Sequence, residues 1–510
     1  MENSFPTEIS IVSLFKMALD FNDIVNVKSV LVLGLSFLLV AWWKQRPRNL
    51  PPGPWRLPII GFVPQLMWSM FYKQEEMHLL ATRLGQKYGK IYSFDLFGLV
   101  FVVINDFSIM KEGNNNPLLS DKGHNNELEK RMLGSSLHSY KHMVEFRKFT
   151  LAAFRGFGMG KHSFHANIEA ESMALLEELD ALKGSPCNPH HFLIISVSNI
   201  LFNVVFGKRH DYNDDNFRNL TNMNNRIMHL LGSGMWSVFL PKYYPTKDAD
   251  EMLNLVQKIY DFVDTLIEEH TQDFDAENPK DFIDVYLKTM KETPKTDDPF
   301  SYLKKDNMRA GLYNVFLGGT TTSTTTLDWC CLYMMAHPDI QEKIQREIDS
   351  VVGRNRLPRI SDQAQLPYTR ATLLEIQRHA VLAPLSDFHT ASADTTLYGY
   401  RIPKGATIVS NIFAVMKDPK VFPEPDRFKP ERFINEHGYF EKEEVCPFGV
   451  GRRICIGETL AKMEIFIFFA HLLHRYSLVK PDDASPVTLE GNYGATFAPK
   501  SFTTKFVPRE

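Results

Sequence analysis

The feature that most constrains this chain is a glycine-rich loop that carries one cysteine and runs directly into a helix. Residues 448–457 read FGVGRRICIG, so the fixed positions follow the order Phe-x-x-Gly-x-Arg-x-Cys-x-Gly. The residues from Thr459 to about His474 have helical character and are apolar on nearly every side. A helix without a polar face is typical of the interior of a large protein. The loop is therefore expected to lie against the core.

Cys455 is expected to act as a metal ligand. The positive end of the following helix and its exposed N–H groups favour the thiolate form of this cysteine. Phe448 can shield the sulfur, and Arg453 can neutralise an acidic group on a bound cofactor. The loop backbone can lie against a flat cofactor because three positions lack side chains, namely Gly449, Gly451 and Gly457. A thiolate beside a planar, carboxylate-bearing group indicates a haem iron ligand, and such a ligand favours O–O cleavage.

This loop resembles the haem-binding loop of the cytochrome P-450 superfamily, with five fixed positions in ten residues and the helix in register. The alternative is a free cysteine in a glycine-rich turn. The resemblance is closest to microsomal animal enzymes that act on steroids, fatty acids and xenobiotics. It implies a mainly α fold with small β-sheets around haem b, with Cys455 as the axial ligand, and a monooxygenase reaction.

Composition narrows the class of protein further. The chain has 510 residues, 44% of them apolar, and no long linker after Gly61. We therefore expect one catalytic unit over residues 61–510. A net charge of −3 argues against nucleic-acid binding. The five cysteines form no C-x-x-C pair, which suits free thiols in a reducing compartment rather than disulfides or zinc.

The N-terminal region is predicted to anchor the protein in a membrane. Residues 25–43 give nineteen largely apolar residues, close to the ~20 that span a bilayer. Residues 1–24 would be luminal, because the basic residues follow the span and the catalytic unit would face the cytoplasm. Residues 44–60 form a basic, proline-rich and stiff hinge. A cleaved signal peptide or a buried core helix are the alternatives. The resemblance implies the endoplasmic reticulum membrane.

The longest helical signal, Lys304 to His337, is weak at its centre, where residues 318–326 read GGTTTSTTT. Glycine and threonine are poor helix formers, and weak residues within a strong helix often mark function. The segment resembles the superfamily element that admits dioxygen and relays protons. The resemblance makes Thr322 the relay threonine and Ser323 its neighbour, while Thr321 stands where an acid is usual. A Ser/Thr-rich linker is the alternative.

The remaining site residues are carried over from the resemblance. Arg147 matches the Arg of a Trp-x-x-x-Arg element that binds a haem propionate, although Met143 replaces the Trp; His389 would bond a propionate. A surface histidine and a solvated arginine are the alternatives. A salt-bridged triad would lock the cysteine loop, made by Glu375, Arg378 and Arg432. The substrate pocket would be lined by Asn314, Gly318, Gly319, Ala383, Leu385, Phe388 and Phe497.

Three further segments are predicted from patterns in the sequence. Residues 91–96 and 100–104 read as a hairpin around Gly98. Residues 395–400 and 406–411 read as a second pair of strands. The aromatic break at Leu240–Pro245 is a candidate for a membrane-dipping substrate entrance, with an ordinary core-facing loop as the alternative.

The resemblance implies hydroxylation or epoxidation of a lipophilic steroid, fatty acid, terpenoid or xenobiotic with O₂. Electrons would come from NADPH through cytochrome P-450 reductase, with cytochrome b5 as a second donor and membrane lipid as surroundings. Lys141, Lys148 and Arg452 are candidates for docking the acidic reductase, with a solvated charged face as the alternative. Because Thr321 is not an acid, a reductase-independent hydroperoxide isomerase is a second hypothesis. A non-catalytic haem-based ligand sensor is a third.

Overall fold

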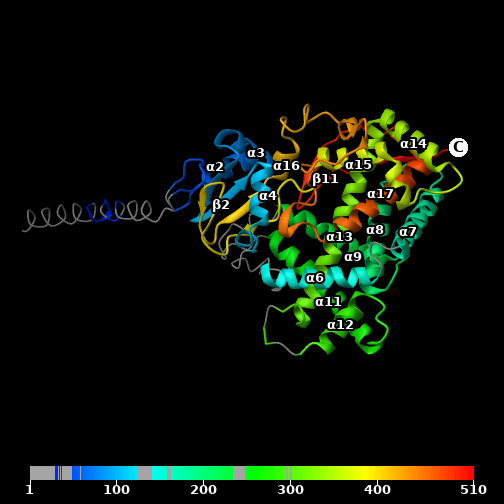
Figure 1. The fold of residues 1–510 in the computed structure, drawn as a ribbon, viewed down its shortest axis with the longest axis horizontal. Coiled ribbons are helices and arrows are strands. Elements are labelled where there is room, and N and C mark those ends of the chain that lie inside the picture. The colour runs from blue at the N-terminus through cyan, green and yellow to red at the C-terminus, as the bar shows by residue number, and fades with distance from the viewer. Residues whose placement is uncertain are drawn as a thin grey trace, which may run out of the picture.

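The computed structural model describes residues 29–32, 34, 36, 49–57, 59–122, 140–157, 162–233, 247–294, 297–298 and 301–509. Long helices form most of this part of the chain, and a small sheet lies at the end nearest the N-terminus (Figure 1). The fold is therefore mainly α with small β-sheets, as the resemblance implies.

The structure confirms the two predicted helices, at residues 304–337 and 459–474, to within a few residues. The loop helix α17 spans Glu458–Arg475 and the weak-centred helix α13 spans Lys305–Ala336. The others are α6 (Tyr140–Gly156), α7 (His162–Ala181), α8 (His190–Phe206), α9 (Asp215–Ser233), α11 (Lys247–Gln272), α12 (Phe282–Glu292), α14 (Pro338–Val352) and α15 (Pro367–Ala380), with shorter helices α2 (Val63–Met67), α3 (Met77–Tyr88), α4 (Phe107–Asn115) and α16 (Ile412–Met416).

The largest sheet has four strands in the order β1-β2-β6-β3. β1 (Ile91–Leu96) and β2 (Leu99–Ile104) pair antiparallel, which confirms the predicted hairpin. Phe97 and Gly98 both have positive φ, as a two-residue hairpin turn requires. β6 (Thr407–Ser410) pairs parallel to β2 and antiparallel to β3 (His389–Thr390).

The second predicted strand pair is wrong in its partners. β4 (Thr395–Leu397) pairs with β5 (Tyr400–Ile402) through a tight turn at Tyr398 and Gly399, both at positive φ. The segment around 407–410 instead joins the main sheet. Parallel pairing there buries Ile408 and Val409, which a two-stranded hairpin at the surface would leave exposed. The remaining pairs are β7 (Ile434–Asn435) with β8 (Gly438–Tyr439), β9 (Tyr476–Val479) with β12 (Lys505–Pro508), and β10 (Gly491–Tyr493) with β11 (Phe497–Pro499).

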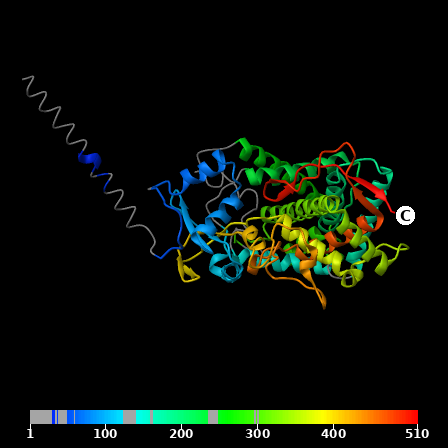
Figure 2. The same cartoon turned by 90° about the horizontal axis from the view of Figure 1, so that it is seen from above.

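Helix α13 runs through the interior of the helical part (Figure 2). It packs against α8, α11, α15 and α17, so it is covered on several sides. Its fully buried side chains include Trp329, Tyr313 and Leu312. Helix α17 is buried along most of its length in the same core. The two helices that the sequence marks as functional therefore lie beside each other in the largest hydrophobic cluster.

Most of the predicted membrane span, residues 25–43, falls outside the described residues, and the break at Leu240–Pro245 falls outside them completely. Within the part of the chain that the structure describes, no helix is both long and apolar enough to cross a bilayer.

Candidate active site

The cysteine loop folds back on itself immediately before α17. The Cys455 N–H donates to Phe448 O at 2.9 Å, and the Gly449 N–H donates to Cys446 O at 3.0 Å. Gly449 and Gly451 have φ of 75° and 82°, conformations that favour glycine. A Cβ on Gly449 meets nothing within 4 Å, whereas one on Gly451 comes within 2.6 Å of Asn114 O. Gly451 is thus required for close packing on α4, a role the sequence did not predict.

The two cysteines near this loop have different environments. Cys455 is exposed, while Cys446 is buried in the core beneath the sheet. Burial raises the pKa of the Cys446 thiol to about 12. Only Cys455 presents its sulfur to a group outside the packed core.

The free thiol of Cys455 is not acidified in the way that the sequence suggests. Desolvation by the surrounding protein raises its pKa, and this effect outweighs the Gly457 N–H and Arg147, which lower it. The expectation of a low thiol pKa is therefore wrong for the metal-free chain. A bound metal cation changes this balance, because coordination deprotonates a thiol directly.

Basic side chains surround the loop. Arg147 Nη1 from α6 donates to Ile454 O at 2.6 Å, and Arg453 Nε donates to Ser120 O at 2.7 Å. His389 on β3 is buried, and desolvation lowers its pKa to about 4, so its ring is neutral at pH 7. Met143, at the place of the expected Trp, is buried with no polar atom to offer. Phe448 is half-buried, with Lys462 Nζ 5.7 Å from its ring centre.

Asp387 belongs to this cluster, and the sequence reasoning missed it. Its Oδ2 lies 3.0 Å from Lys122 Nζ. Lys122 has the largest effect on this carboxyl and, with Arg453, lowers its pKa to about 2, although desolvation acts in the opposite direction. The sequence signal that could have revealed it is a single acid within residues 381–388, which carry no other charge.

The weak centre of α13 is fully helical and places its three candidate side chains differently. Thr322 Oγ1 donates to Gly318 O at 2.6 Å, and a Cβ on Gly318 meets nothing within 4 Å. Thr321 is buried, and its hydroxyl has no hydrogen-bond partner among the described residues. Ser323 is buried and interacts with the Glu464 carboxyl on α17. Only Thr322 and Gly318 therefore face open space.

Gly319 does not fit its predicted place in a substrate pocket. A Cβ at this position would lie 2.3 Å from Leu201 Cδ1 on α8. The glycine allows α8 and α13 to approach closely, so its role in the structure is helix packing.

The other predicted pocket residues occupy several places. Asn314 Nδ2 donates to Ala310 O at 2.7 Å on α13, and Ala383 is half-buried. Leu385 and Phe388 pack against the cluster formed by the main sheet and α3. Phe497 stacks on Trp329 with ring centres 5.5 Å apart. Phe497 therefore lies beside α13, whereas Leu385 and Phe388 are partly buried against the hydrophobic cluster of the main sheet.

The predicted triad is present. Arg378 Nε donates to Glu375 Oε2 at 2.6 Å, and Arg432 Nε donates to Glu375 Oε1 at 3.0 Å. It connects α15 to the segment that precedes the cysteine loop.

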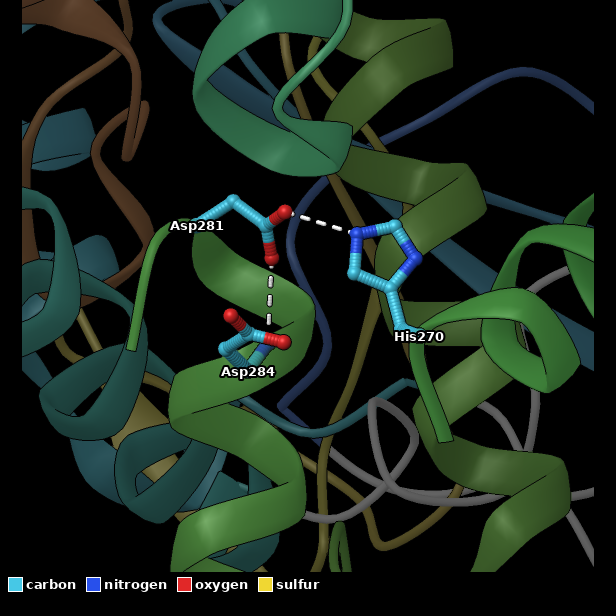
Figure 3. Close-up of side chains that lie close together, drawn as sticks. All are labelled: His270, Asp281 and Asp284. Atoms are coloured by element: carbon cyan, nitrogen blue, oxygen red, sulfur yellow. Dashed lines mark hydrogen bonds and ion pairs between the residues drawn. The ribbon is translucent and has the colours of Figure 1, made fainter. Parts of the chain in front are cut away.

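A second cluster of possible metal ligands lies far from this site in sequence (Figure 3). His270 Nε2 lies 2.7 Å from Asp281 Oδ2, and its Nδ1 lies 2.7 Å from Leu266 O. Asp281 Oδ1 accepts the Asp284 N–H as the N-cap of α12. Both ring nitrogens and the capping carboxylate are engaged, so hydrogen bonding and capping explain the cluster without a metal.

A haem fits the residues around Cys455. The exposed sulfur lies at the start of α17, and Gly318 on α13 leaves free space beside Thr322. Lys122, Arg147 and Arg453 supply positive charge, and His389 supplies a neutral ring nitrogen. This set of donors matches a planar group with two acidic arms.

Comparison with known proteins places the chain in a family. The family described as Cytochrome P450 matches residues 51–506. The chain is 34% identical to Cytochrome P450 2J5 of Mus musculus, covering 98% of this chain and 99% of the relative. It is also 34% identical to Cytochrome P450 2U1 of Bos taurus, with 92% and 91% covered, and to Cytochrome P450 2J2 of Homo sapiens, with 95% and 97% covered. The chain therefore belongs to the cytochrome P450 family of monooxygenases, which use haem b held by an axial cysteine thiolate.

Proposed function

We propose that the chain is a membrane-anchored monooxygenase that hydroxylates or epoxidises a lipophilic small molecule, such as a steroid, fatty acid, terpenoid or xenobiotic. O₂ is the oxidant, and NADPH electrons arrive through cytochrome P-450 reductase, with cytochrome b5 as a second donor. The observation that carries this proposal is the exposed Cys455 at the start of buried α17, beside an α13 whose Gly318 and Thr322 face open space.

The residues of the chain divide the work. The haem supplies the redox chemistry of iron with dioxygen when it is bound. Cys455 is the proposed axial ligand, and Lys122, Arg453 and His389 are proposed to hold the haem acids. Arg147 holds the Ile454 carbonyl and so fixes the loop next to the ligand.

Thr322 is the proposed proton carrier. Its hydroxyl donates to Gly318 O at 2.6 Å, which leaves the oxygen lone pairs available to accept from a water or a substrate hydroxyl. Thr321 lacks both a carboxyl group and access, so it supports the helix rather than the transfer. Ser323 is proposed to act through its interaction with Glu464, which holds α13 against α17.

The proposed organisation follows from the N-terminal sequence. Residues 1–24 are luminal, 25–43 span the endoplasmic reticulum membrane, 44–60 are a hinge and 61–510 form the cytoplasmic haem domain. Lys141 and Lys148 are exposed along α6, and Arg452 donates to Tyr140 Oη from the cysteine loop, so a basic face lies near the haem ligand. This arrangement supports docking of an acidic reductase there.

A hydroperoxide isomerase is the second candidate, because position 321 carries no acid and the Thr321 hydroxyl is buried. Purified protein should be given, in separate reactions, a lipophilic substrate panel with reductase and NADPH, and a fatty-acid hydroperoxide alone. The monooxygenase proposal predicts oxygenated product only in the first reaction. Product only in the second reaction, without NADPH, contradicts it and supports the isomerase.

A further inference from the structure

His270 lies in the last turn of α11, close to the start of α12, and its ring faces Asp281 (Figure 3). Nε2 lies 2.7 Å from Asp281 Oδ2, and Nδ1 lies 2.7 Å from Leu266 O. A carbonyl oxygen and an ionised carboxylate only accept hydrogen bonds, so both ring nitrogens donate. A neutral imidazole has one donor nitrogen, whereas an imidazolium has two. The geometry therefore requires the charged form of His270.

The surroundings of the ring favour this charge. The side chains of His270 and Asp281 are 13% and 4% exposed, so water screens little of their attraction. The hydrogen bond to Asp281 has the largest effect and, with the charge of Asp284, raises the pKa of His270 above 6.5, although desolvation acts in the opposite direction. The negative end of the α11 dipole also favours a cation there. The neighbouring Glu269 pairs at 2.5 Å with Lys208, which follows α8.

The carboxylate that faces His270 also connects the ends of two other helices. Asp281 Oδ1 accepts the Asp284 N–H at 3.0 Å as the N-cap of α12, and Asp281 O accepts the Val285 N–H at 3.2 Å. A Cβ on Gly207 would lie 2.7 Å from Asp281 Oδ2, so the carboxylate lies against the end of α8. His270 therefore holds, from α11, the group that caps α12.

The packing of α12 on α6 depends on a few aromatic contacts. Phe282 and Tyr286 lie against Phe149 of α6, with ring centres 5.4 and 4.7 Å apart. Beside these rings is a pocket of about 460 Å³, whose lining includes Pro279 and Val285. The pocket leaves part of both helix surfaces without protein contacts, unlike a close-packed interior. The attachment of α12 is therefore sensitive to how its first turn is held.

We propose that His270 is a proton-dependent clasp, which fastens the start of α12 while its ring is an imidazolium and loosens α12 when the ring releases one proton to water. A neutral ring turns a lone pair toward either Asp281 Oδ2 or Leu266 O, so one of the two hydrogen bonds is lost. Because α6 carries Arg147, which holds Ile454 O, the clasp lies behind the helix that supports the cysteine loop. The clasp does not depend on the proposed reaction.

The direction of the pH dependence follows from proton linkage. The pKa of His270 is higher in the folded protein than its ordinary value of 6.5. The contribution of the clasp to stability is therefore fully present below pH 6.5, and it is lost as the pH rises through the higher pKa of the folded protein.

Hydrogen exchange of the haem-loaded full chain measures the attachment of α12. The reporters are the Asp284 and Val285 amides, both of which donate to Asp281. Their exchange is followed by mass spectrometry of short peptides from pH 6 to pH 9, and each rate is divided by the intrinsic exchange rate at that pH. Amides of α17, which is buried in the core, serve as the reference for global unfolding.

Three variants isolate the ring charge. His270→Gln removes it. Asp281→Asn removes the charged partner but keeps a side chain that caps helices well. The matched control is His437→Gln, which removes a histidine that is 84% exposed and lies near Glu436.

In the wild-type protein, the protection of the two reporter amides should fall by about tenfold as the pH rises, as expected for the loss of one hydrogen bond to a charged group. The α17 amides should not follow this change. His270→Gln should give the lower protection at every pH, Asp281→Asn should lose the pH dependence, and His437→Gln should follow wild type.

The wild-type profile decides the matter even if a variant does not fold. Constant protection of the reporter amides from pH 6 to pH 9 overturns the inference, and so does an equal fall in the α17 amides. A folded His270→Gln variant that keeps the wild-type pH dependence overturns it as well.

Discussion

Arg378 and Glu375 lie one turn apart on α15, and both side chains are completely buried, joined by hydrogen bonds of 2.6 and 3.0 Å. The same Glu375 carboxylate accepts the Lys429 N–H and Arg432 Nε, so it holds the segment before the cysteine loop. Arg378 also donates to two backbone carbonyls, of Met416 and Pro425. The buried pair of Glu375 and Arg378 therefore connects α15 to Met416, to Pro425 and to the segment 429–432.

Glu375→Gln should destabilise the protein strongly. It leaves two guanidinium groups without their charged partner, and breaking a buried ion pair costs about 3–5 kcal/mol. Urea unfolding followed by circular dichroism measures the loss. The matched control is Glu342→Gln, which breaks an exposed pair with Arg346 and should change the unfolding free energy by less than about 1 kcal/mol. Equal effects of the two substitutions would show that the triad is not a stabilising network.

The neighbouring glycines on α13 should respond in opposite ways to alanine. Gly319→Ala places a Cβ against Leu201, and overpacking of a core typically costs about 1–3 kcal/mol. Gly318→Ala meets open space and should raise the unfolding free energy of the haem-free protein by up to about 1 kcal/mol through helix propensity. Thermal unfolding of the two variants checks this. A loss of stability in Gly318→Ala would contradict the assignment of its face.

Thr322→Val should uncouple NADPH consumption from product formation, because it removes the hydroxyl that faces open space. The expected measurement is product formed per NADPH, with the carbon monoxide spectrum unchanged. Thr321→Val is the matched control, with the same change one residue away. It should keep the product yield and raise the unfolding free energy by about 1–3 kcal/mol, because it removes a buried hydroxyl that has no partner. If Thr321→Val uncouples the enzyme equally, Thr322 is not the specific carrier.

The buried carboxyl of Glu464 should make stability depend on pH. Desolvation raises its pKa from 4.5 to about 8 in the folded protein, so the folded state keeps the proton. The contribution of Glu464 to the unfolding free energy is fully present below pH 4.5. It decreases as the pH rises toward 8, because the unfolded chain releases this proton at a lower pH than the folded protein does. Glu464→Gln keeps a neutral side chain and should lose this dependence. Urea unfolding at pH 5, 6.5 and 8 measures this difference. Between pH 5 and pH 8 the unfolding free energy of Glu464→Gln should rise, relative to that of wild type, by roughly a few kcal/mol. A constant difference would contradict the neutral buried carboxyl.

The sequence predicted the two helices at 304–337 and 459–474 and the first hairpin from local periodicity, and the resemblance supplied the triad through motifs in a fixed order. It did not predict the partner of β6, because a parallel pairing with β2 joins segments about three hundred residues apart. It assigned Gly319 to a pocket because spacing along a helix does not reveal which neighbour covers a given face. It missed Asp387 because its ion-pair partner, Lys122, is more than two hundred and sixty residues away in the sequence and only the fold brings the two side chains together.

The central claim is that the Cys455 sulfur ligates the haem iron, and the spectrum of the reduced protein under carbon monoxide tests it most directly. The Soret band should move to the long-wavelength position that thiolate ligation opposite carbon monoxide produces. Cys455→Ser should abolish that band, while Cys446→Ser, at the buried cysteine, should keep it. A wild-type protein without the band, or a Cys455→Ser variant that retains it, would contradict the claim.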